Sequence, residues 1–274
     1  MEQDLSKLCI HTITTRDWTL ETAVEKYLEK GIHGISVWRN YIESKDMREV
    51  RDLLESHHMK VVSLVRGGFF TGLTQSERDK KVEDNKVAIE EAASIGAEMV
   101  VLVCGATPGQ SLEESRYQIR DGIESILPMA ESSGVKLAIE PLHPMYADTR
   151  SAINSLDQAN TLAEYFRSEY VGVAVDVYHI WWDDKLKDEI IRCGKHKNLF
   201  AFHLCDWRNP TQDMLNDRTI MGEGVIQIQK IIDYVKEAGF DGYNEVEIFS
   251  NRHWAEDQDI FLDKIVQAYL NYKY

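Results

Sequence analysis

The sequence predicts an α/β fold, a single-domain (β/α)₈ TIM barrel spanning residues 1–274. Short β-prone apolar runs alternate with longer helical patterns along the chain, which is typical of parallel strands joined by helical crossovers. About eight such units fit into the chain, as expected for a barrel of ~250 residues. An open doubly wound sheet is the alternative, but no GxGxxG motif follows the first strand. No linker or change in composition divides the chain.

The predicted strands are apolar runs bounded by polar residues or glycine, a pattern that suits strands buried on both faces. In chain order they are Leu8–Thr14, Gly34–Trp38, Val61–Val65, Met99–Val103, Val135–Glu140, Val171–Asp176, Phe200–Trp207 and Tyr243–Ile248.

The predicted helices fill the segments between the strands, and several of them stop at a glycine, a reliable helix terminator. A long segment without a helical pattern, residues 208–224, is a loop of the length that usually carries function. The helices are predicted over Asp17–Lys30, Ser44–His58, Ser76–Ile95, Leu112–Ser132, Leu156–Arg167, Lys185–Cys193, Val225–Ala238 and Asp259–Leu270.

The composition, 43% hydrophobic and 28% charged, is that of a globular protein. The net charge of −15 repels duplex nucleic acid and phosphate-rich membrane surfaces, so neither is an expected partner. The four cysteines form no CxxC pair, which argues against a zinc ribbon or redox dithiol. Met1–Asp4 lacks the basic and apolar regions of a signal peptide, and no apolar stretch is long enough to span a bilayer. We therefore expect a cytoplasmic protein.

Metal-capable side chains stand at or near the ends of the last four predicted strands: Glu140, Asp176, His203 and Glu247. Since the carboxyl ends of barrel strands converge on one rim, these residues are expected to be neighbours there. Each alone is compatible with a helix cap, an ion pair or a core histidine. Together, three carboxylates and one imidazole suit Mn²⁺, Mg²⁺ or Co²⁺ before Zn²⁺. Glu245 is a rival for the last position.

Other residues on the same rim are candidates for substrate contacts. His179 follows Asp176 and could orient a substrate hydroxyl, while His143 could reach the same cavity. Either Trp181 or Trp182 could form a stacking face for a sugar, or pack on a neighbouring helix.

Three arginines follow strands on this rim, Arg66, Arg208 and Arg218. Arginine recognises carboxylate or phosphate in bidentate fashion. They indicate an anionic or polyhydroxylated ligand, with a solvated surface position as the alternative for each.

The motifs Ile139–Pro144, Val175–His179, His203–Arg208, Gly222–Gly224 and Val246–Ser250 resemble, in their order and spacing, those of the sugar phosphate isomerase/epimerase family. This family belongs to the xylose isomerase-like TIM barrel superfamily. The resemblance covers the whole chain in architecture and is most specific from Glu140 to Ser250.

The resemblance implies a divalent metal, commonly Mn²⁺, on Glu140, Asp176, His203 and Glu247. In the ketose epimerase branch the two glutamates also carry protons, which would make Glu140 and Glu247 catalytic. His179 matches a substrate-contact position, and Arg208 lies near the family's substrate arginine. The family often forms dimers or tetramers, so a homo-oligomer is also an expectation.

The predicted function is a metal-dependent isomerase or epimerase of a keto sugar or related polyol. A glutamate removes the proton next to the carbonyl, giving a metal-bound enediolate, and the second glutamate returns a proton. Loss of a β-hydroxyl from the same intermediate would instead make the protein a lyase or dehydratase, as in the inosose dehydratase branch. A non-catalytic sugar-binding barrel is the remaining alternative.

Overall fold

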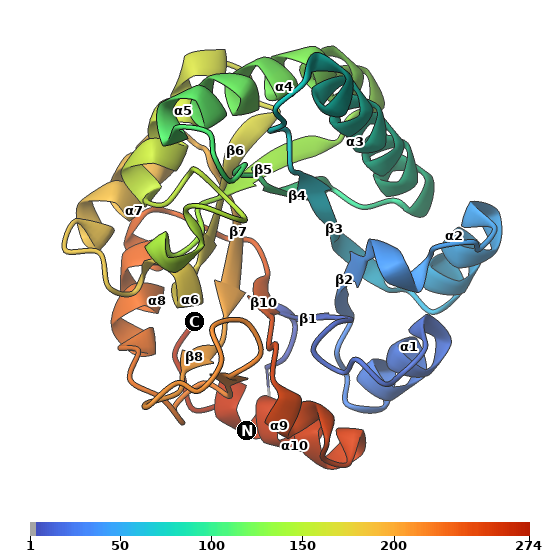
Figure 1. The fold of residues 1–274 in the computed structure, drawn as a ribbon. Coiled ribbons are helices and arrows are strands. Elements are labelled where there is room, and N and C mark those ends of the chain that lie inside the picture. The colour runs from blue at the N-terminus through green and yellow to red at the C-terminus, as the bar shows by residue number, and fades with distance from the viewer. Residues whose placement is uncertain (1–3) are drawn as a thin grey trace.

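Eight parallel strands close into a barrel in the computed structural model, which describes residues 4–274 (Figure 1). Around the barrel the strand order is β1-β10-β7-β6-β5-β4-β3-β2, with each neighbouring pair parallel. The predicted fold class is therefore confirmed, while residues 1–3 of the predicted domain and N-terminus lie outside the described residues. The barrel strands are β1 Leu8–His11, β2 Gly34–Trp38, β3 Lys60–Gly68, β4 Met99–Val103, β5 Lys136–Glu140, β6 Val171–Asp176, β7 Leu199–Leu204 and β10 Asn244–Val246.

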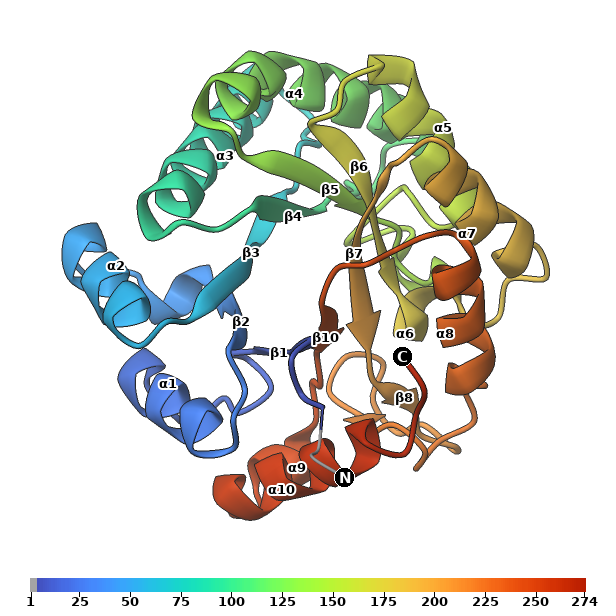
Figure 2. The same ribbon diagram turned by 180° about the vertical axis from the view of Figure 1, so that it is seen from behind.

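Helices surround the barrel on its outer side in both views (Figures 1 and 2). Their bounds agree with the predicted helices to within a few residues. Thr74 and Glu77 form a capping box at the start of α3, and Gly96 ends this helix with φ 77°. The long helices of the ring are α1 Leu20–Glu29, α2 Met47–Ser56, α3 Gln75–Ile95, α4 Leu112–Ser133, α5 Leu156–Phe166, α7 Leu186–Lys195, α8 Ile228–Glu237 and α10 Gln258–Tyr269.

Short elements at the rim differ from the prediction. Two single-turn helices, α6 Val177–Ile180 and α9 Asn251–Trp254, follow the ends of β6 and β10. The predicted seventh strand is split, because the chain leaves the barrel after Leu204 and β8 (Asp206–Trp207) pairs antiparallel with β9 (Arg218–Thr219). The segment predicted to be irregular therefore contains a strand that returns the chain to the rim.

Asp206 has a structural role at this point. Its carboxylate accepts hydrogen bonds from the backbone amides of Gly222, Gly224 and Ile226 at 2.9–3.0 Å. These bonds hold the turn before α8 against the two-stranded ribbon.

Three alanines lie in the interior of the barrel beneath the candidate ligands. Ala138, Ala174 and Ala201 are fully buried in one cluster inside the barrel. Each lies two residues before a candidate ligand, and side chains two apart on a strand share a face. The larger core, between barrel and helices, is built from the alternate strand residues such as Leu137, Val173 and Phe202.

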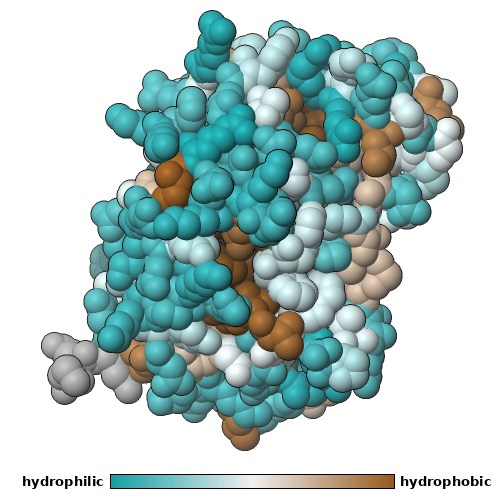
Figure 3. Space-filling view, turned by 90° about the vertical axis from the view of Figure 1, so that its left-hand side faces the viewer, coloured by the Kyte–Doolittle hydropathy of each residue, from teal (hydrophilic) through white to brown (hydrophobic). Residues whose placement is uncertain are grey.

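One face of the molecule is predominantly hydrophilic (Figure 3). On the side of the molecule drawn at the left of Figure 1, hydrophobic residues show only in limited streaks (Figure 3). Among the described residues, no helix combines the length and apolar character needed to cross a membrane.

Candidate metal centre and active site

The structure brings the four predicted ligands together at the carboxyl-terminal end of the barrel. Glu140 and Asp176 end β5 and β6, His203 lies in β7, and Glu247 directly follows β10. These strands are consecutive neighbours in the closed sheet. One ligand atom from each residue lies within 4.8 Å of the others. The four side chains therefore point into one shared space.

This cluster has the chemistry of a divalent-cation site. Its members are at most 5% exposed, and buried carboxylates need positive charge or hydrogen bonds to compensate for lost hydration. Three carboxylate oxygens and one imidazole nitrogen are a donor set used by Mn²⁺, Mg²⁺, Co²⁺ and Zn²⁺. The residues thus fit a divalent metal ion without rearrangement of the strands that carry them.

A buried arginine supplies part of the compensating charge. One terminal nitrogen of Arg218 donates to Asp176 Oδ2 at 2.9 Å and to Glu247 Oε2 at 2.8 Å. Burial alone would raise the pKa of Glu247, but the charges of Arg218 and His11 hold it well below its usual range. Glu247 is therefore ionised at neutral pH.

Burial acts differently on two other ligands. It raises the pKa of Asp176 to about 6, against the opposing charge of Arg218. For His203, burial disfavours the charged ring, but the carboxylates of Glu245 and Glu140 outweigh it and raise the pKa to about 10. The Nδ1 atom of His203 lies 3.0 Å from Glu140 Oε1. A metal binding at this nitrogen must displace a proton, so its affinity will depend on pH.

Above the cluster lies a small cavity. Its free volume is about 20 Å³, enough for one water molecule and far too small for a sugar. Leu215, from the loop between β8 and β9, is one of its walls. The polar part of the lining consists of Glu140, Glu247, Arg66, Arg150, Arg218 and His179.

Residues 24–265 match the family described as xylose isomerase-like TIM barrel. The chain belongs to this family. The matched region contains the four predicted ligands and all residues of the cavity lining. Family membership confirms the resemblance noted in the sequence.

Individual relatives cover nearly the whole chain. Inosose isomerase from Bacillus licheniformis is 24% identical over 265 residues, which are 90% of this chain and 91% of the relative. Protein SMc04130 from Sinorhizobium meliloti 1021 has a crystal structure with TM-score 0.95 and 42% identity, covering 98% of both chains. The IolI protein, crystallised with a zinc atom, has TM-score 0.85 and 21% identity over 97% of both chains. At that identity the likeness to IolI concerns the fold.

Two of the five predicted substrate contacts line the cavity of this family member. Arg66 and His179 do so, and His179 Nε2 lies 3.2 Å from a guanidinium nitrogen of Arg218. His143 lies behind His179, donating its backbone amide to His179 Nδ1 at 3.1 Å. Trp182 is 40% exposed and donates its indole N–H to the His179 carbonyl at 2.8 Å. His143 and Trp182 therefore contact His179 but are not part of the cavity lining.

Arg208 lies outside the cavity lining, and its predicted role as a substrate contact stays a prediction. It donates to Asp217 Oδ1 at 2.7 Å, and Asp217 also accepts from the backbone amide of Gln212 at 2.6 Å. Arg208 thus fixes the base of the loop between β8 and β9. Arg218 takes the inward position, because β9 pairs with β8 and turns its side chain over the cluster.

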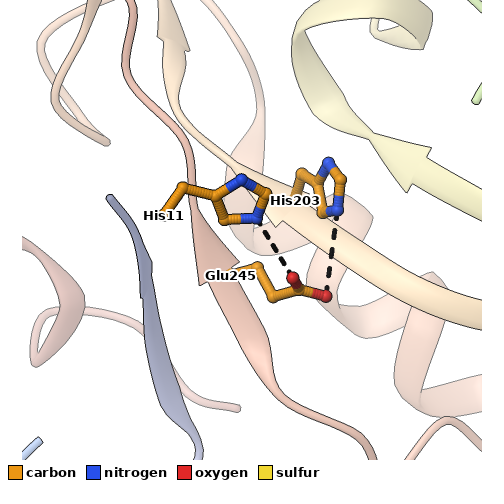
Figure 4. Close-up of side chains that lie close together, drawn as sticks. All are labelled: His11, His203 and Glu245. Carbon is orange, nitrogen blue, oxygen red and sulfur yellow. Dashed lines mark hydrogen bonds and ion pairs between the residues drawn. The ribbon is translucent and has the colours of Figure 1, made fainter. Parts of the chain in front are cut away.

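A second polar layer lies beneath the ligands and was not predicted as a unit (Figure 4). Glu245 accepts from His11 Nε2 at 3.1 Å, Ser36 at 2.6 Å and Ser63 at 3.1 Å. With His203 and His11, Glu245 forms another group that could hold a metal ion. The sequence carries a signal for this layer, since Glu245 lies in β10 and Glu247 follows its end two residues later, and extended residues two apart point to the same face.

Proposed function

We propose that this protein is a divalent-metal-dependent isomerase or epimerase of a keto sugar or related polyol. The observation that carries the proposal is the buried cluster of Glu140, Asp176, His203 and Glu247 directly beneath a cavity that both glutamates line. The inosose isomerase relative, 24% identical over 90% of this chain, supports the same class of substrate and reaction.

The two glutamates are the proposed proton carriers. Arg218 and His11 keep Glu247 ionised, which suits it to accept a proton from the carbon next to a carbonyl. Glu140 reaches the same cavity and, entering the step as a protonated carboxyl group, donates its own proton to the substrate. Return to the opposite face of the same carbon is epimerisation, and return to the neighbouring carbon is isomerisation. The two reactions share their first step.

The remaining residues position the substrate and exclude water. Arg218 and His179 line the cavity beside Glu247, where the guanidinium N–H groups of Arg218 can orient oxygens of the substrate and stabilise an enediolate. Leu215 and Phe249 give the cavity apolar walls. A bound divalent metal, which we propose to be Mn²⁺ on the four clustered residues, would polarise the substrate carbonyl. The zinc in the IolI protein makes Zn²⁺ the principal alternative.

Solvent deuterium exchange tests this function. Purified protein with added Mn²⁺ is incubated in D₂O with a panel of keto sugars and keto-inositols, and products are analysed by NMR and mass spectrometry. We expect deuterium at the carbon next to the carbonyl of at least one compound. Glu247→Gln and Glu140→Gln should each abolish turnover, while Glu98→Gln, a surface control paired with Lys60, should not.

The products also separate the competing functions. A product lighter by one water would identify a lyase or dehydratase acting through the same first step. Binding of a panel member without exchange would favour a non-catalytic sugar-binding barrel. Full activity in Glu247→Gln would remove this residue from the proton-transfer role.

A further inference from the structure

Two arginines line the cavity without a carboxylate partner. Among the described residues, neither Arg66 nor Arg150 has a side-chain hydrogen bond or an ion pair within 4.0 Å, although both line the cavity with Glu140 and Glu247. Most arginines of the chain do have such partners, Arg39, Arg192, Arg208 and Arg218 among them. Unpaired, partly buried guanidinium groups are unusual in a protein of net charge −15.

The backbone directs one of these arginines toward the cavity. The register of β3 with β4 shifts between Val65 and Gly67, so that Arg66 is the extra residue at this irregularity. Such bulges re-aim a side chain and recur beside active sites. Arg150 approaches from the segment between β5 and α5.

Aromatic rings hold both side chains. The guanidinium carbon of Arg66 lies 4.3 Å from the ring centre of Phe69, and that of Arg150 lies 5.5 Å from the ring centre of Tyr146. An arginine stacked on a ring keeps its N–H groups available in the plane of the guanidinium. The two arginines are thus held in place while their donors stay unused.

The two positive charges also disfavour each other. Burial and the charge of Arg150 lower the pKa of Arg66 to about 10. Arg66 therefore remains protonated at neutral pH, although its surroundings destabilise the charged form. An anion between these groups would remove the repulsion and satisfy the unused donors with charge-assisted hydrogen bonds.

We propose that Arg66 and Arg150 form a subsite for a terminal anionic group, a phosphate monoester or a carboxylate, on the substrate. This inference rests on the proposed function, because it places the group on the same keto sugar or polyol whose carbon faces Glu140 and Glu247. A neutral sugar would leave both guanidinium groups without a counter-charge. The substrate class is therefore an anionic keto sugar or polyol.

Calorimetry with three small probes tests the subsite separately from turnover. Glycerol 3-phosphate, glycerate and glycerol differ only in one end group, and each is titrated into the full chain with Mn²⁺. We expect at least one anion to bind roughly tenfold or more tightly than glycerol, the size of one charge-assisted pair. Tighter binding of glycerol 3-phosphate indicates a phosphate ester, and tighter binding of glycerate indicates a carboxylate.

Matched variants assign the effect to the two arginines. Arg66→Gln and Arg150→Gln should each weaken binding of the preferred anion roughly tenfold. Arg48→Gln, an exposed arginine at the start of α2, should leave it unchanged. Thermal melts check that each variant folds. If Arg66→Gln does not fold, the anion affinity of Arg150→Gln is compared with that of Arg48→Gln instead.

Two results would overturn the subsite. One is equal affinity of the wild type for both anions and glycerol, and the other is the same affinity in Arg66→Gln as in Arg48→Gln. Deuterium exchange confined to neutral ketoses would likewise reject the anionic substrate while leaving the proposed function intact. Anion binding that depends on Arg66, without exchange in any compound, would support the subsite and reject the proposed function.

Discussion

The Nε2 atom of His203 lies 3.8 Å from the Oε1 atom of Glu245, and neither atom has a hydrogen-bond partner among the described residues. The opposite ring nitrogen, Nδ1, faces Glu140 at 3.0 Å. The imidazole therefore lies between a candidate metal ligand and the fully buried carboxylate of Glu245, and Figure 4 shows the Glu245 side of the ring. A carboxylate behind a ligand histidine typically fixes the orientation of the ring and raises its basicity.

Glu245→Gln should therefore weaken metal binding while preserving the fold. Glutamine can still accept the hydrogen bonds from Ser36 and Ser63, but it removes the negative charge behind His203. We expect the affinity for Mn²⁺ to fall by about 10–100-fold, measured by titration with electron paramagnetic resonance of free Mn²⁺. Glu98→Gln is the surface control. A titration curve of Glu245→Gln that superposes on that of the wild type would contradict the positioning role.

The fold and the meeting of the ligands could be predicted because they depend on local patterns. A barrel strand buried on both faces reads as an apolar run, and the first polar residue at its end marks the rim. Glu140 and Asp176 are such residues. Once the alternation of strands and helices indicates a barrel, the convergence of these ends follows from its geometry.

The choice between neighbouring polar residues could not be predicted, because it depends on long-range pairing. Arg208 and Arg218 are equivalent by composition, and only the pairing of β8 with β9 turns Arg218 inward. Arg150 lies in a connecting segment without a periodic pattern, so no local signal marked it. His11 is a polar residue at the end of β1, as Glu140 is at the end of β5. Its contacts with Glu245 and Glu247 come from the last strand of the barrel, so no local pattern predicts them.

Arg218→Gln should shift the pH dependence of catalysis. Glu247 acts as a base only when ionised, and the positive charge of Arg218 helps to hold its pKa well below the usual range. Removing that charge raises the pKa, so the acidic limb of the rate profile moves to higher pH. A neighbouring guanidinium favours the ionised form of a carboxyl group, so we expect the limb to move in this direction.

The measurement is the rate of deuterium exchange as a function of pH with saturating Mn²⁺. Arg208→Gln is an informative comparison, because Arg208 binds Asp217 at the base of the loop instead of Glu247. An acidic limb that stays in place in Arg218→Gln, with only a uniform loss of rate, would show that Arg218 does not tune Glu247.

We expect the loop between β8 and β9 to move when a sugar enters, because its Leu215 walls a cavity of only about 20 Å³. Two tyrosines hold this loop down. The hydroxyls of Tyr146 and Tyr178 both donate to the backbone carbonyl of Met214, the latter at 3.0 Å. Each such bond contributes about 0.5–1.5 kcal/mol. The two bonds together therefore favour the closed loop by an amount that a local opening can overcome.

The double variant Tyr146→Phe/Tyr178→Phe should open this loop more often. Phenylalanine retains the rings, including the one that Arg218 stacks on at 4.4 Å, so only the two hydroxyl contacts are lost. Hydrogen exchange followed by mass spectrometry should show amides of residues 208–217 exchanging roughly tenfold faster or more. Tyr165→Phe, at an exposed tyrosine on α5, is the matched control. Unchanged exchange in this segment would mean that the loop is held by the Arg208–Asp217 pair at its base and not by the tyrosines.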